Sequence, residues 1–204
     1  ADGLITGNAV DISYDGKRIA THTYENNSHK IAIYDYAESG NSFFQKGETI
    51  NIGTSSFRGN GIALSGDGSK VAWAGIGRLQ VFELDYSGDS TNNIIRTSDD
   101  YYSVDLNGNG TILAFSNKSD GVVKVWDISD SAQGSSEIEI GFFNQDTWKA
   151  EPFNMTDQAS GSLDWEDIEV SLDQSGTFLA IGFPYADNNV SDTGKVALYK
   201  YTDA

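Results

Sequence analysis

VDISYDGKRIA, residues 10–20, is the stretch that decides the fold, because its pattern returns three more times along the chain. The later copies are IALSGDGSKVA at 62–72, VDLNGNGTILA at 104–114 and VSLDQSGTFLA at 170–180. Each copy has an alternating apolar run, a short polar turn that ends in glycine, and an apolar pair that ends in alanine. The turn glycines are Gly16, Gly68, Gly110 and Gly176. Repeats at this spacing predict an architecture built from one supersecondary unit.

Each copy predicts a β-hairpin followed by a third strand. Asp-Gly and Asn-Gly pairs favour tight turns with positive φ, and the flanking residues alternate as strand residues do. We expect third strands at 30–36, 78–86, 122–129 and 195–201, and fourth strands at 43–50, 93–97 and 137–143. Each unit is therefore a four-stranded antiparallel meander. Equivalent positions of the third strands carry aromatic side chains that should pack between units, namely Tyr34, Phe82, Trp126 and Tyr199.

A single meander cannot bury both of its faces, so the units must stack, and stacking around an axis gives a β-propeller. We expect an all-β fold with one small four-bladed propeller domain over residues 1–204. The blades are expected at about 7–52, 53–97, 98–143 and 162–204, with an insertion at about 144–161. Residues 1–6 join the last blade in this interpretation, and residues 3–6 close the ring by pairing there as its outer strand. The alternatives are a fragment of a larger propeller or a domain of a longer fibre-like chain.

The units resemble two kinds of propeller repeat. ISYDG at 12–16 and LSGDG at 64–68 resemble the turn of WD-type repeats, and VWD at 125–127 resembles the end of their third strand. The last unit, with IGFP at 181–184 and GKVALY at 194–199, is similar to FG-GAP-like repeats. Such repeats are abundant in secreted, surface and viral proteins of marine microbes, so the resemblance implies an extracellular, cell-surface or virion location. The hairpin turns are too short to supply the six or more oxygens that calcium takes, so the calcium site of FG-GAP blades is not carried over.

Charge and composition exclude several kinds of partner. The formal net charge is −17, from 13 basic and 30 acidic residues, so we expect no binding to nucleic acid or to an anionic membrane. No apolar stretch is long enough for membrane insertion. Cysteine is absent, which removes disulfides and thiolate chemistry. The two histidines, His22 on an expected strand and His29 in an expected loop, are assigned structural roles, and the chain has neither a nucleophile-elbow nor a phosphate-loop motif.

The candidate ligand-binding residues are aromatic and acidic side chains in or beside connections at one propeller face. Aromatic rings surrounded by Asp and Asn suit stacking on a sugar or contact with a protein. The acidic run DWEDIE at 164–169 could instead ligate a cation or supply a pair of catalytic carboxylates. The binding candidates are Tyr24, Phe57, Tyr101, Tyr102, Asp164, Trp165, Glu166 and Tyr185. The loop at 185–192 offers Asp187, Asn189 and Asp192 as calcium ligands, and no other cofactor is expected.

The sequence favours a non-catalytic binding or assembly module that recognises a glycan or a protein through one propeller face. A viral or phage fibre, a decoration protein or a receptor-binding domain would fit this description. One alternative is a carboxylate-dependent glycoside hydrolase or lyase that uses the acidic run. Another is a purely structural domain of a homo-oligomer. Fold alone does not decide among them.

Overall fold

The part of the chain that the structure describes consists of β-strands and their connections, and it contains no helix. This computed structural model describes residues 8–54, 61–97, 99–117, 122–129, 148–150, 168–183 and 195–201. Within these residues no helix is long and apolar enough to cross a membrane.

The strands form four antiparallel sheets that follow one another along the chain. Sheet 1 contains β1 (Ala9–Ile12), β2 (Arg18–Glu25), β3 (Ser28–Ala37) and β4 (Ser42–Thr54). Sheet 2 contains β5 (Gly61–Leu64), β6 (Lys70–Gly75), β7 (Arg78–Leu84) and β8 (Ser90–Thr97). Sheet 3 contains β9 (Tyr101–Leu106), β10 (Ile112–Asn117) and β11 (Val122–Asp127). Sheet 4 has the order β13 (Glu169–Leu172), β14 (Phe178–Phe183), β15 (Lys195–Tyr201) and β12 (Trp148–Ala150).

The four repeated turns form the hairpins that the sequence predicts. In the first, Gly16 has a φ of 71°, and its N–H donates to the Ser13 carbonyl at 2.9 Å. The Asp15 carboxylate accepts from the Ser13 hydroxyl at 2.7 Å and from the Lys17 N–H at 2.9 Å. These hydrogen bonds, the one from Ser13 first, hold the pKa of Asp15 below its ordinary value. The other three turn glycines also have positive φ, between 65° and 73°.

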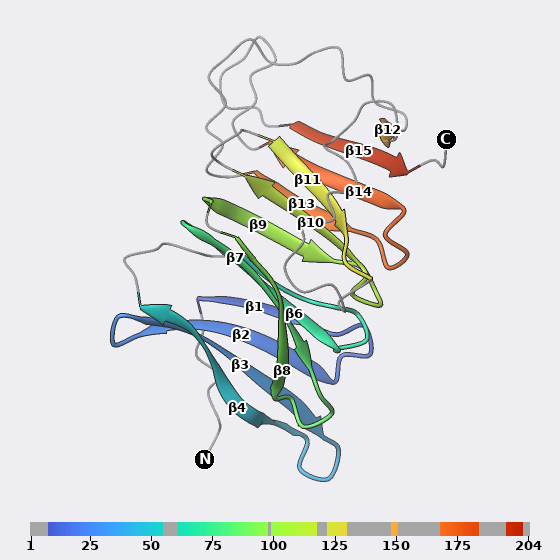
Figure 1. The fold of residues 1–204 in the computed structure, drawn as a ribbon. Coiled ribbons are helices and arrows are strands. Elements are labelled where there is room, and N and C mark those ends of the chain that lie inside the picture. Colours follow the sequence, from blue (N-terminus) through green and yellow to red (C-terminus); the bar gives the residue numbers. More distant parts are fainter. Residues whose placement is uncertain are drawn as a thin grey trace.

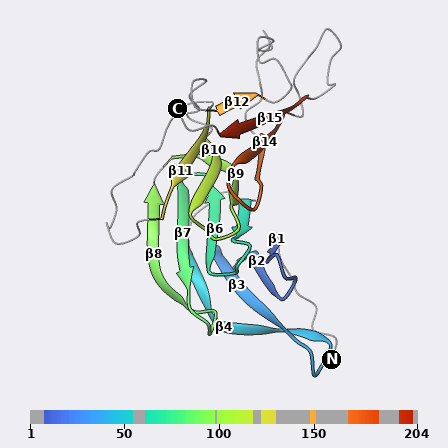
Figure 2. The ribbon, with the colours of Figure 1, turned by 90° about the vertical axis from the view of Figure 1, so that its right-hand side faces the viewer.

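The sheets lie one upon another in an arc, with sheet 1 and sheet 4 at opposite ends (Figures 1 and 2). The first strand of each sheet is its inner strand, so β1, β5, β9 and β13 lie side by side in that order. Main-chain hydrogen bonds join the hairpin turns of neighbouring sheets. Tyr14 N–H donates to Gly66 O at 2.8 Å, Asp67 N–H to Gly108 O at 2.7 Å, and Gly108 N–H to Gln174 O at 2.8 Å. We call this row of contacts the turn seam.

The ring closure expected from the sequence is not present among the described strands. Residues 3–6, which were expected to pair with the last sheet, lie outside the described residues. The outer edge of β15 is taken instead by β12, whose Trp148 pairs with Tyr201 and whose Ala150 pairs with Tyr199. Among the strands that the structure describes, the arc is therefore open between sheets 1 and 4. The expected fourth strand at 137–143 also lies outside the described part of the chain.

Apolar side chains fill the spaces between successive sheets. Between sheets 1 and 2, Ile31 and Ile33 pack with Val71 and Trp73. Similar clusters lie between sheets 2 and 3, around Phe115, and between sheets 3 and 4. The predicted role of the third-strand aromatics is confirmed for three of them, because Phe82, Trp126 and Tyr199 are all buried between sheets. Tyr34, in the first sheet, is only half-buried.

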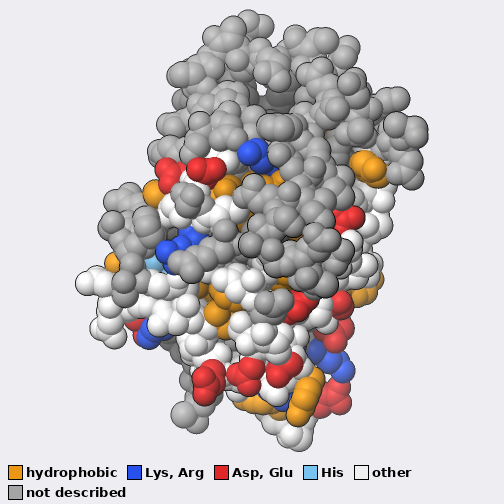
Figure 3. Space-filling model, in the orientation of Figure 1, with side chains coloured by type: hydrophobic (Ala, Val, Ile, Leu, Met, Phe, Trp, Pro, Cys, Tyr) orange, Lys and Arg blue, Asp and Glu red, His pale blue; other side chains and the backbone are white. Residues whose placement is uncertain are grey.

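The described surface is acidic, as the net charge requires. Figure 3 shows Asp and Glu side chains spread over the visible face, with Lys and Arg interspersed among them. Arg18 differs from these surface side chains in being largely buried. Its guanidinium pairs with Asp35 at 2.7 Å and donates to the Gly68 carbonyl at 2.9 Å. That side chain joins sheet 1 to sheet 2 at the turn seam.

Candidate functional site

Between the four inner strands lies a hollow of about 290 Å³. All four sheets contribute to its lining, because the inner strands of the sheets lie next to one another. Its polar lining comes from Asp11 on β1, from Tyr102, Ser103 and Asp105 on β9, and from Glu169 and Ser171 on β13. A hollow at this place in the fold, lined by acidic groups, is the natural candidate for a functional site.

Two of these carboxylates act as clamps between inner strands. Asp11 accepts the N–H of Leu64, on the next inner strand, at 2.6 Å, and with its other oxygen accepts the N–H that follows it in the chain. Asp105 repeats the arrangement between sheets 3 and 4: it accepts the N–H of Leu172 at 2.7 Å and, with its other oxygen, the N–H that follows it in the chain. Ala63 occupies the equivalent position of sheet 2, so no such carboxylate joins sheets 2 and 3.

The Asp105 carboxyl has an unusual proton affinity. Burial raises its pKa to about 6, and the charge of Asp11 across the hollow also raises it, while the N–H of Leu172 opposes the rise. Glu169 receives a hydrogen bond from the Ser103 hydroxyl at 2.9 Å, and the same hydroxyl accepts the Val170 N–H at 3.0 Å. A carboxyl with a raised pKa is common at functional sites, but Asp105 also holds two sheets together.

Removal of the first clamp should weaken the contact between sheets 1 and 2. Asp11→Ala leaves the Leu64 N–H without its acceptor, and an unsatisfied donor that is partly buried costs about 1–3 kcal/mol. We expect the free energy of unfolding, measured by urea denaturation, to fall by about that amount. Asp99→Ala, the same substitution at an exposed position, should change it by less than about 0.5 kcal/mol. Equal losses in the two variants would contradict a clamping role for Asp11.

The structure describes three of the predicted binding residues and separates their roles. Tyr102 is half-buried and lines the hollow. Tyr24 is exposed at the end of β2 and donates a hydrogen bond to Asn27 at 3.3 Å. Tyr101 lies in the core instead of on a binding face, because its ring packs edge-on against Phe115 with centroids 5.4 Å apart. The other predicted residues lie outside the described part of the chain, namely Phe57, Asp164, Trp165, Glu166, Tyr185, Asp187, Asn189 and Asp192.

Sequence reasoning missed a buried histidine pair. The expectation that His29 lies in a loop is wrong, because it lies in β3, where Nδ1 is 2.9 Å from Nε2 of His22. The two rings stack with centroids 5.1 Å apart, and both contact Trp73. Burial, with the charge of His29 adding to it, lowers the pKa of His22 to about 4. Strand alternation was the available signal, since it places His22 on the inward face with Ala20.

No group of three metal-ligating side chains comes together among the residues that the structure describes. The histidine pair is therefore not joined by a third His, Asp or Glu ligand within that part of the chain. The carboxylates of the hollow are likewise engaged mainly with backbone N–H groups and a serine hydroxyl.

The arc of sheets is similar to solved β-propellers. A candidate 6-phosphogluconolactonase from Bacteroides uniformis superposes with a TM-score of 0.55 at 15% identity, over 92% of this chain and 52% of that one. The β-propeller domain of Swd1 from Myceliophteria thermophila superposes with a TM-score of 0.53 at 14% identity, over 89% of this chain and 51% of that one. No family model and no curated protein matches the sequence. The fold is thus propeller-like, and the chain spans about half the length of these two solved structures.

Proposed function

We propose that the chain is a non-catalytic binding module that recognises a glycan or a protein through one edge of the stack. The observation that carries this proposal is the use of the carboxylates of the hollow as clamps. Asp11 and Asp105 each accept two backbone N–H groups, one of them from a neighbouring sheet. Carboxylates held in this way stabilise the scaffold and leave recognition to the edges. An extracellular, cell-surface or virion setting belongs to the same proposal.

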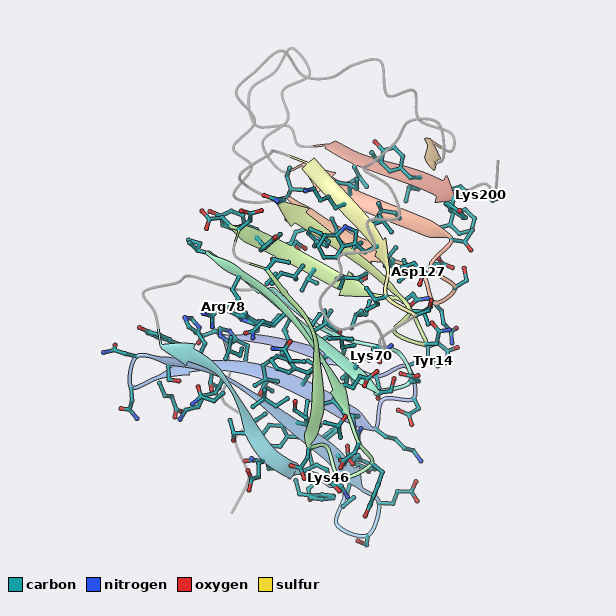
Figure 4. The ribbon with its side chains drawn as sticks, in the orientation of Figure 1. Tyr14, Lys46, Lys70, Arg78, Asp127 and Lys200 are labelled. Carbon is teal, nitrogen blue, oxygen red and sulfur yellow. The ribbon has the colours of Figure 1, made fainter. Side chains whose placement is uncertain are left out.

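The edge that we assign to binding is the one where the inner strands begin, called here the entry edge. Tyr24 lies there beside the β2–β3 turn, and Tyr102 lies there near the start of β9. Arg78, at the start of β7, marks this edge in Figure 4, whereas Tyr14 and Lys70 mark the opposite edge. The Tyr24 ring contacts the His29 ring at a centroid distance of 4.6 Å with a tilt of 39°, and the side chain remains exposed. An anchored, exposed ring of this kind suits stacking on a sugar or a partner side chain.

A glycan array probed with the purified chain, with calcium and with a chelator, tests the proposal. We expect specific retention that falls at least tenfold, about 1.4 kcal/mol, in Tyr24→Ala and Tyr102→Ala. Tyr86→Ala is the matched control, because Tyr86 is highly exposed and follows β7 at the opposite edge. Signal lost in the Tyr86 variant alone would contradict the entry edge. An array without any signal would exclude a glycan ligand and leave a protein as the proposed ligand.

Hydrolysis is the second candidate function, and the raised pKa of Asp105 favours it. A carboxyl that is protonated up to about pH 6 could act as a general acid beside Glu169 on the next inner strand. One of the similar solved structures is a candidate lactonase. Sugar lactones are therefore the first substrates to test, together with aryl glycosides. A rate above the buffer blank that declines above pH 6 and disappears in Asp105→Asn would establish this function. Rates equal to the blank would support the binding module.

A further inference from the structure

Both ends of the arc present apolar sheet faces whose equivalents are buried elsewhere in the stack. On sheet 4, Val196 and Leu198 of β15 are 61% and 39% exposed. The equivalent third-strand residues of the first three sheets point toward the next sheet and are at most 6% exposed. These equivalents are Ile31, Ile33, Leu79, Val81, Val123 and Val125. The outer face of sheet 4 therefore has the composition of a face that contacts a following sheet, and no such sheet lies beside it within the described part of the chain.

Sheet 1 has the complementary property at the other end. Val10 and Ile12 of β1 are 66% and 50% exposed. Their equivalents on later inner strands point toward the preceding sheet, and those that are buried are Leu64, Val104, Leu106 and Val170. Tyr34 shows the same pattern, because it is half-buried while its three equivalents are buried against a preceding sheet. The outer face of sheet 1 is therefore built to follow another sheet.

The turn seam specifies how the two end faces would meet. In each internal contact, the residue two positions after a turn glycine lies over the turn glycine of the next sheet. A Cβ added to that second glycine would lie about 3 Å from the covering side chain, in the pairs Arg18 with Gly68, Lys70 with Gly110, and Ile112 with Gly176. Phe178 holds the covering position on sheet 4 and is exposed. Gly16 holds the covered position on sheet 1, and an added Cβ there would have no atom within 4 Å.

We propose that a second copy of this chain covers both end faces, with sheet 4 of each copy packed against sheet 1 of the other. Phe178 of one copy then lies over Gly16 of its partner, which continues the turn seam across the junction. The size of the arc favours two copies, because it superposes on 52% and 51% of two solved propellers. Two identical head-to-tail contacts related by a twofold axis close a ring and leave neither face exposed. The structure thus assigns these faces to self-association, beyond any role of the entry edge in ligand binding.

Molar mass measured by light scattering over a concentration series tests the proposal. We expect the chain to have twice its monomer mass of 22.1 kDa at high concentration. Phe178→Asp should restore the monomer mass by placing a charge in the junction. Phe44→Asp is a closely matched control, because Phe44 and Phe178 are both 45% exposed and each has a lysine ammonium over its ring, at 5.8 and 5.6 Å. Phe44 lies on the opposite face of sheet 1 from Val10 and Ile12, so this variant should keep the dimer mass.

Three outcomes would overturn the proposal. A wild-type chain that stays monomeric throughout the series, with the circular dichroism of a folded β protein, would assign the end faces to a different partner. A mass that grows beyond two copies with concentration would show an open polymer instead of a closed pair. If Phe44→Asp and Phe178→Asp dissociated the dimer to the same extent, the junction could not be assigned to the faces of sheets 1 and 4 named here.

Cysteine cross-linking gives a second test that does not depend on destabilising variants. A Cβ on Gly108 would lie 2.5 Å from Cγ of Gln174, so equivalent turn positions of neighbouring sheets are adjacent. Tyr14 and Gln174 hold those positions at the two ends, and the natural chain contains no cysteine. The double variant Tyr14→Cys with Gln174→Cys should oxidise to a covalent dimer with two bridges. Phe44→Cys with Gln174→Cys should not, and equal cross-linking of both double variants would overturn the ring.

Discussion

Trp73→Ala should lower the free energy of unfolding by about 3–5 kcal/mol, among the largest losses expected from a single substitution in this chain. Trp73 is 1% exposed and is the largest fully buried side chain described. It packs between sheets 1 and 2 with Ile31, Ile33 and the histidine pair. Its indole N–H has no hydrogen-bond partner in the described structure, so the loss would come from packing alone. Urea denaturation followed by tryptophan fluorescence and circular dichroism measures it.

Two further variants separate a cavity from a general effect of losing an aromatic residue. Trp73→Phe keeps most of the ring volume and should lose less than the alanine variant. Tyr86→Ala removes an exposed ring and should change the free energy of unfolding by less than about 0.5 kcal/mol. A loss below about 1 kcal/mol in Trp73→Ala would mean that the space between sheets 1 and 2 collapses without cost.

The buried histidine pair should make the protein sensitive to acid. The pKa of His22 falls from 6.5 to about 4 on folding, so the folded state disfavours its charged form. The stability from this group is fully present above pH 6.5 and is lost as the pH falls toward 4, because the unfolded chain takes up the proton first. The shift corresponds to a loss of about 3 kcal/mol at pH 4 and below.

The control for this effect is His22→Phe, which keeps a ring in the stack and removes the titrating group. Urea denaturation from pH 7.5 to 4 should give a wild-type curve that falls below that of the variant between about pH 6.5 and 4. Carboxylates with lowered pKa, such as Asp15 and Asp67, also lose stability in acid, but they do so equally in both proteins. Parallel curves for the two proteins would show that His22 is not the acid-sensitive group.

The hairpins and meanders could be predicted because they depend on chemistry within a few residues of each turn. The β2–β3 turn shows where that local chemistry was misread. Asn26 and Asn27 have φ of 52° and 60°, so they form the whole turn, and β3 begins at Ser28. Asparagine tolerates this conformation better than most residues, but the sequence suggested a longer loop there. The misplaced boundary is what removed His29 from the strand and concealed the histidine pair.

Ring closure and the candidate site could not be predicted in the same way. The number of sheets in a ring depends on the angle between neighbouring sheets, which the volumes packed between them determine. In sheet 2, for example, Trp73 on one face and Ala63 on the other both affect that angle. No local sequence pattern predicts their combined effect. The hollow could not be predicted for a similar reason. Asp11 and Asp105 lie 94 positions apart in the chain and come together only when the sheets stack. Tyr102, which lines the hollow, was among the predicted residues because it lies beside a strand start, whereas the clamps were not predicted.

The turn seam has a consequence for how such repeats diverge over evolution. Both partners in each of its hydrogen bonds are main-chain groups, so the bonds themselves do not depend on the identity of the side chain. Positions 14, 66, 108 and 174 accordingly hold Tyr, Gly, Gly and Gln, yet all four take part in the seam. The side chains at positions 14 and 174 can therefore differ without loss of these hydrogen bonds, whereas a Cβ at Gly108 would lie 2.7 Å from the Gln174 carbonyl oxygen and would move the turns apart. Because the seam uses main-chain groups, the arc can resemble solved propellers in fold at only 14–15% sequence identity.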